Sequence, residues 1–111
     1  MKDFNIKSGD TLPYLRCKIV SKETGEVHAL SNTATATFTM VDENGDVVID
    51  DAPVVVEDDV GAIIHYEWDE ADTANRGGTV CDGEFRVEDD GETFKVPGKG
   101  YIKIVIGESL T

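Results

Sequence analysis

Hydrophobic and polar residues alternate with a period of two along most of this chain. The clearest case is the segment in which Ala34, Ala36, Phe38 and Met40 alternate with threonines. Successive side chains of a strand point to opposite faces of a sheet, so this pattern predicts strands with one buried face. The predicted strands are 4–6, 15–19 with a short continuation at 27–30, 34–40, 47–49, 53–57, 62–68, 80–87, 93–96 and 101–106.

Turn signals separate these segments. Asn44-Gly45 is a strong hairpin signal, and Gly25 supplies a positive φ in another loop. Residues 69–75 predict one helical turn that Asp69 caps, and Gly77-Gly78 follows it. About eight or nine short strands at roughly 8–12-residue spacing predict an all-β antiparallel sandwich or barrel. The length of 111 residues fits one domain over 1–111, without a long helix.

Aromatic residues are scarce, at 7% of the chain, so the large ones are expected in the core. Between Ala62 and Trp68 the more apolar face carries Ile64, Tyr66 and Trp68, and we expect that face to point inward. An exposed aromatic anchor at a protein interface is the alternative for the last two. The predicted structural core consists of Phe38, Tyr66, Trp68, Phe85 and Ile104.

The net charge is −13, from 23 acidic and 10 basic residues. Nucleic acids and anionic membranes attract Lys and Arg, so the charge argues against both as partners. It predicts a solvated acidic surface, with a basic partner surface or divalent cations as the alternatives. No apolar run approaches the roughly 20 residues that span a bilayer, and no signal peptide is recognisable, which predicts synthesis in the cytoplasm.

Candidate catalytic groups are weak. The carboxylate pairs Asp50-Asp51, Asp58-Asp59 and Asp89-Asp90 are expected in exposed turns, which do not shift a pKa as catalysis requires. Residues 42–46 faintly resemble a calcium loop, but predicted strands flank them and favour a hairpin turn. No nucleophile motif, phosphate-binding loop or cofactor motif occurs. We therefore predict neither an enzyme nor a cofactor.

The histidines and cysteines do not have zinc-ligand spacing, so no metal site is predicted. His65 is expected to be an outward-facing polar residue, unless acidic neighbours form a surface cluster with it. Cys17 and Cys81 are expected to be small buried residues with free thiols, because Trp68 lies too near the second cysteine to match the immunoglobulin Cys-Trp-Cys spacing.

Nearly the whole chain resembles the small immunoglobulin-like domain at the N-terminus of phage baseplate upper proteins and related short tail proteins. The resemblance rests on short motifs in a distinctive order. These are Ile6-Lys7-Ser8-Gly9-Asp10-Thr11 with Pro13, Ala36-Thr37-Phe38-Thr39-Met40, Gly61 through Tyr66-Glu67-Trp68, Asp72-Thr73, Gly77 or Gly78, Glu84-Phe85-Arg86-Val87, Pro97, and Tyr101-Ile102-Lys103-Ile104.

The resemblance implies an immunoglobulin-like β-sandwich and a structural role without catalysis. We expect a virion protein of the tail, baseplate, neck or head surface, made in the host cytoplasm. It would bind other virion proteins in a symmetric assembly, and the binding residues are not identified by the sequence. The alternative is a carbohydrate- or cell-surface-binding module with an exposed platform from Tyr14, Tyr66, Trp68 or Tyr101. A calcium-dependent adhesin domain is a weaker option.

Overall fold

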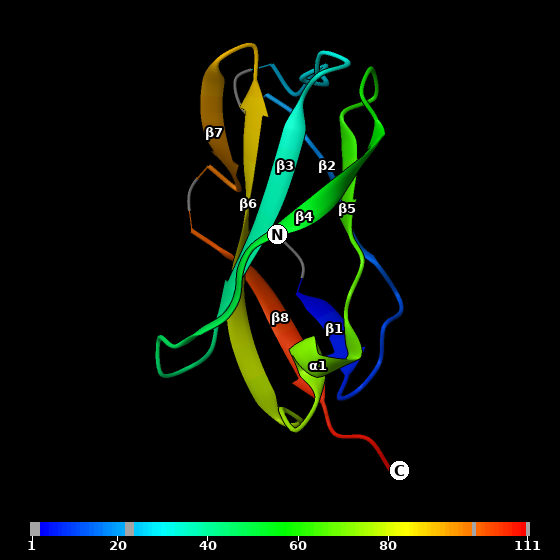
Figure 1. Cartoon of the computed structure of the whole chain (residues 1–111), viewed down its shortest axis with the longest axis vertical. Coiled ribbons are helices and arrows are strands. Elements are labelled where there is room, and N and C mark those ends of the chain that lie inside the picture. The colour runs from blue at the N-terminus through cyan, green and yellow to red at the C-terminus, as the bar shows by residue number, and fades with distance from the viewer. Residues whose placement is uncertain (1–2, 22–23, 99, 111) are drawn as a thin grey trace.

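Eight strands and one short helix make up the described part of the chain, residues 3–21, 24–98 and 100–110, in this computed structural model (Figure 1). The fold is all-β, as the alternating pattern predicts. The elements are β1 (Phe4–Lys7), β2 (Leu15–Lys18), β3 (Thr35–Val41), β4 (Val47–Asp58), β5 (Ile63–Tyr66), α1 (Glu70–Thr73), β6 (Thr79–Asp89), β7 (Glu92–Val96) and β8 (Ile102–Gly107).

The strands follow the order β1-β8-β6-β3-β4-β5-β2, and β7 pairs with β6 outside this path. Strand β6 is shared along its length, since its first part pairs with β8 and its last part with β7. The sheet curves until it is nearly barrel-like (Figure 1). Three strands, β1, β2 and β7, each have only one strand neighbour in the described residues, so each leaves one edge unpaired.

The first and last strands depart from the antiparallel prediction. Strand β1 runs parallel to β8, with Phe4 opposite Ile104 and Ile6 opposite Ile106. Tight hairpins force antiparallel pairing, but these two strands are separated by most of the chain, so no hairpin constrains their direction. The other strand pairs are antiparallel.

A single strand, β4, replaces the two strands predicted at 47–49 and 53–57. It pairs with β3 up to Val54 and then with β5 from Val55, so it carries the sheet around from one side to the other. The prediction that Asp50-Asp51 lies in a turn is therefore wrong. Asp51 has a φ of 47° and sits at an irregularity where two threonine hydroxyls, of Thr37 and Thr39, donate to its carboxylate. A β-bulge keeps the chain extended there, which composition alone does not distinguish from a turn.

The core lies between the inward faces of the strands. All five predicted core residues are buried, with exposed fractions of 0% for Phe38, Phe85 and Ile104, 5% for Tyr66 and 4% for Trp68. The ring of Phe38 lies at the centre of an aromatic cluster, with centroids 4.9 Å from Tyr66, 5.1 Å from Phe85 and 5.9 Å from Trp68.

Two further local predictions have different outcomes. Asp69 caps α1 as expected, because its carboxylate accepts from the backbone N–H of Ala71. The predicted continuation at 27–30 is not a strand, and only an isolated bridge joins Val27 to Val20. The described part of the chain has no helix long and apolar enough to cross a membrane.

Candidate functional site

The short helix α1 is tied to the aromatic core through Asp72. The hydroxyl of Tyr66 donates to the Asp72 carboxylate at 2.7 Å, and the backbone N–H of Asp69 donates to the same oxygen at 2.9 Å. Burial, followed by this bond to Asp72, raises the pKa of Tyr66 above its usual range, so its hydroxyl remains a donor. The Asp72 carboxylate is therefore bonded both to a core tyrosine and to the backbone at the start of the helix.

Thr73 joins the same helix to the first turn of the chain. Its side chain is fully buried, and its hydroxyl accepts from the backbone N–H of Gly9 at 2.8 Å. The Ser8 hydroxyl in turn donates to the carbonyl oxygen of Thr73 at 3.0 Å. The motifs Ser8-Gly9-Asp10, Tyr66-x-Trp68 and Asp72-Thr73, which are far apart in sequence, thus form one network that we call the α1 network.

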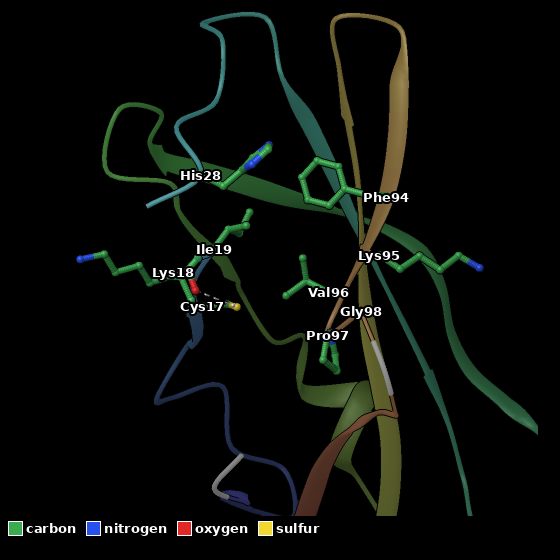
Figure 2. Close-up of a pocket in the computed structure, with 10 residues that line it drawn as sticks. Cys17, Lys18, Ile19, His28, Phe94, Lys95, Val96, Pro97 and Gly98 are labelled. Carbon is green, nitrogen blue, oxygen red and sulfur yellow. Dashed lines mark hydrogen bonds between the residues drawn. The ribbon is translucent and has the colours of Figure 1, made fainter. Parts of the chain in front are cut away.

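An apolar cleft of about 310 Å³ lies between the region of β2 and strand β7 (Figure 2). Cys17, Ile19 and His28 line one side, and Phe94, Val96 and Pro97 line the other. The rings of His28 and Phe94 meet edge to face with centroids 5.3 Å apart. The cleft therefore occupies the position where the curved sheet remains open between its edges.

The charge around this cleft differs from the rest of the molecule. The described residues that line it include Lys18 and Lys95 and no acidic residue, although the chain as a whole has a net charge of −13. Both lysine side chains point away from the cleft on opposite sides (Figure 2), and Lys95 lies 3.6 Å from Glu84. The lining of the cleft is thus apolar, with the two lysine side chains directed outward and Lys95 paired with an acidic residue.

The two cysteines lie in different environments. Both thiols are free, Cys81 being buried in β6 and Cys17 being only half-buried beside the cleft. The prediction that both are buried is therefore wrong for Cys17, because β2 is an edge strand and its inward face opens into the cleft. Burial raises the pKa of both thiols, so neither is activated as a nucleophile.

His65 lies at the centre of a polar cluster on the outer face of β5. Its Nδ1 is 2.9 Å from a carboxylate oxygen of Glu57 in β4, and its Nε2 is 2.8 Å from a carboxylate oxygen of Glu67. The ring of Tyr14 stacks on the imidazole with centroids 5.0 Å apart and an angle of 7°. Arg16 of β2 donates to Glu57 through Nε and Nη2. These residues, the His65 cluster, connect three neighbouring strands.

The cluster favours the charged imidazolium. The hydrogen bond to Glu67 raises the pKa of His65 and the bond to Glu57 adds to this, while desolvation opposes them. The bond from Arg16, followed by that from His65, lowers the pKa of Glu57. The outward orientation of His65 was predicted correctly, but its exposed fraction is only 8%. Its acidic neighbours come from another strand and from position i+2, and only the second could be read in the sequence.

The acidic turns do not form a site. Asp42 accepts from the backbone N–H groups of Asn44 and Asp46, as in a hairpin turn. The Asp89 carboxylate accepts from Ser31. Among the described residues, no group of three or more His, Cys, Asp or Glu side chains is arranged to hold a metal ion. The lining of the apolar cleft comes from segments that no sequence spacing connects.

Comparison of the chain with protein-family models, with curated proteins and with solved structures gave no match.

Proposed function

We propose that the protein is a non-catalytic structural subunit of a phage virion, with an immunoglobulin-like β-sandwich fold and a place in the tail, baseplate, neck or head surface. It acts as an adaptor that docks onto other virion proteins in a symmetric assembly. The strand order supports the sandwich. Strands β3, β4 and β5 are consecutive neighbours and β6 returns beside β3, which is the Greek-key order found in most β-sandwiches.

The α1 network supports the structural role. Three motifs of the resemblance to phage tail domains have their hydroxyl and carboxylate groups engaged with backbone or with Tyr66. Residues committed to such bonds specify a fold, and they are not free to activate a substrate. The resemblance therefore concerns architecture.

The observation that carries the adaptor role is the cleft between the unpaired edges of β2 and β7. Unpaired strand edges accept extended segments of other chains, and neighbouring apolar pockets hold their side chains. The acid-free lining repels an acidic virion protein less than the acidic turns do. The occupant we propose is an extended, apolar segment of a neighbouring virion subunit.

Carbohydrate binding is the weaker alternative. Of the four aromatic residues considered for a platform, Tyr66 and Trp68 are buried. Tyr14 is 40% exposed but uses one ring face on His65, which leaves Tyr101, 58% exposed, as the other accessible ring. A flat platform of several rings is not formed by these four residues.

Particle assembly tests the proposal. Val20 lines the cleft and is 48% exposed, so Val20→Asp places a charge in the cleft at little cost to folding. Val47 is 59% exposed and does not line the cleft, so Val47→Asp is the matched control. Mass analysis of purified particles is expected to detect the parent and Val47→Asp, and to show loss of Val20→Asp. Absence of the parent from particles contradicts the virion role, and equal incorporation of both variants contradicts docking at the cleft.

A further inference from the structure

The His65 cluster connects three strands through one titratable ring. His65 belongs to β5, Glu57 to β4, and Arg16 to β2, where it lies directly opposite His65 in the strand register. Tyr14 precedes β2 and covers the imidazole face. Edge strand β2 has four residues and pairs with β5, and on its outward face Arg16 donates to Glu57, the carboxylate that His65 also contacts.

The bonding pattern depends on the protonation of this ring. A protonated imidazole has two N–H donors, and each can donate to one of the two carboxylates. A neutral imidazole has one N–H, so either Glu57 or Glu67 then faces a ring nitrogen lone pair. The pair of contacts, 2.9 and 2.8 Å long, is fully satisfied only in the charged state.

We propose that His65 is a pH-sensitive clamp: while the ring is protonated it joins Glu57 of β4 to Glu67, and it holds Glu57 in position for Arg16 of edge strand β2. Loss of the proton removes one of the two donated bonds, and loss of the bond to Glu57 leaves that carboxylate bound to Arg16 without His65, which loosens the link between β2, β4 and β5. Arg16 is followed in β2 by Cys17 and Lys18, which line the cleft, so a change in the contact between Arg16 and Glu57 occurs next to the cleft wall. The clamp follows from the cluster geometry alone, and only its effect on docking rests on the proposed function.

The direction of the pH effect follows from linkage. The pKa of His65 is raised in the folded state, so its stabilising contribution is complete below the unfolded value of about 6.5 and is lost as pH rises through the folded value. Each unit between the two pKa values corresponds to about a tenfold change in the folding equilibrium constant. The pKa of Glu57 is lowered, so its contribution is lost only at acidic pH, as the pH falls through that value.

Two measurements on the purified protein test the clamp. The chain has two histidines, so NMR resolves two imidazole titrations, and His65→Gln identifies the signal that belongs to His65. We expect the folded protein to titrate His65 above about 6.5. A midpoint at or below that value overturns the proposal.

Urea unfolding between pH 6 and 8.5 is the second measurement. The parent is expected to lose stability as pH rises, and His28→Gln, which leaves the cluster intact, is expected to follow the same curve. His65→Gln is expected to lack this component. Groups shared by all three proteins, such as an α-amino group, cancel in the comparison. Identical pH profiles for the parent and His65→Gln overturn the clamp, whereas a failure of particle incorporation at the cleft overturns only the proposed function.

Discussion

The α1 network and the His65 cluster hold two regions of the molecule by different means. In the α1 network, a fully buried threonine and a buried tyrosine bond to backbone and to a helix-capping carboxylate beside Trp68. In the His65 cluster, Arg16 of edge strand β2 pairs with Glu57, and His65 contacts both Glu57 and Glu67, whose side chains remain partly exposed. Packing of buried groups does not change near neutral pH, whereas a histidine cluster does. The first region is therefore expected to be rigid and the second adjustable.

Trp68 is the residue whose truncation is expected to have the largest effect. Its ring is 4% exposed and lies 5.1 Å from Tyr66 and 5.7 Å from Phe4. Trp68→Ala should lower the free energy of unfolding by about 3–5 kcal/mol because a large cavity remains. Thermal unfolding followed by circular dichroism measures this, and Tyr101→Ala is the exposed aromatic control. Red-shifted emission from the parent, whose sole tryptophan is Trp68, would contradict its burial.

Gly83→Ala tests how tightly the aromatic core is packed around Phe38. A Cβ atom at this position of β6 would lie 2.7 Å from the ring of Phe38, which cannot move without disturbing Tyr66 and Phe85. Gly83→Ala should therefore destabilise the protein by about 1–3 kcal/mol through overpacking. Gly107→Ala is the matched control, since the nearest atom there is 3.7 Å away. Equal denaturant midpoints for the two variants would mean that the Phe38 ring adjusts freely.

Thr73→Val tests the α1 network, because the substitution removes a hydroxyl group and changes the volume of the side chain little. Thr73→Val removes the acceptor of the Gly9 N–H and leaves a backbone donor unsatisfied near a buried side chain. The expected loss is about 1–3 kcal/mol, measured by urea unfolding. Thr35→Val, at an exposed position of β3, is the control. A loss that matches the control would show that water replaces the bond and that the network is not needed for folding.

The core could be predicted from the sequence because its signal is local. Alternation within single strands identified the inward faces of residues 34–40, 62–68 and 80–87, and those faces are buried. The helical turn at α1 was predictable for the same reason, since an Asp cap acts on residues two or three positions away.

The cleft and the His65 cluster could not be predicted because they depend on pairing between distant segments. Glu57 meets His65 only because β4 continues past a bulge at Asp51 and then pairs with β5. The cleft exists because β7 returns along β6 and leaves its other edge facing β2. No periodicity within either segment reports which strand lies next to it.

Alkylation of Cys17 is expected to have the smallest effect of the changes considered. Cys17 belongs to β2, the edge strand that carries Arg16 of the His65 cluster. It is half-buried in the cleft, while Cys81 is fully buried and should be inert in the folded protein. Alkylation of the native protein is therefore expected to modify one thiol, and alkylation after denaturation without reductant should modify two. No reactive thiol in the denatured protein would reveal a disulfide and contradict a reducing history.

The alkylation rate of Cys17 can show whether a partner docks at the cleft or on another surface. Stability should be unaffected, because the reagent enters an existing cleft beside an edge strand. If a neighbouring virion subunit occupies the cleft, Cys17 should react more slowly in intact particles than in the free protein, and dissociation of the particles should restore the rate. An apolar contact should also keep Cys17 protected at about 1 M salt, where charge attraction is screened within about 3 Å. Equal reaction rates in particles and in solution would place the contact on another surface and leave the cleft open.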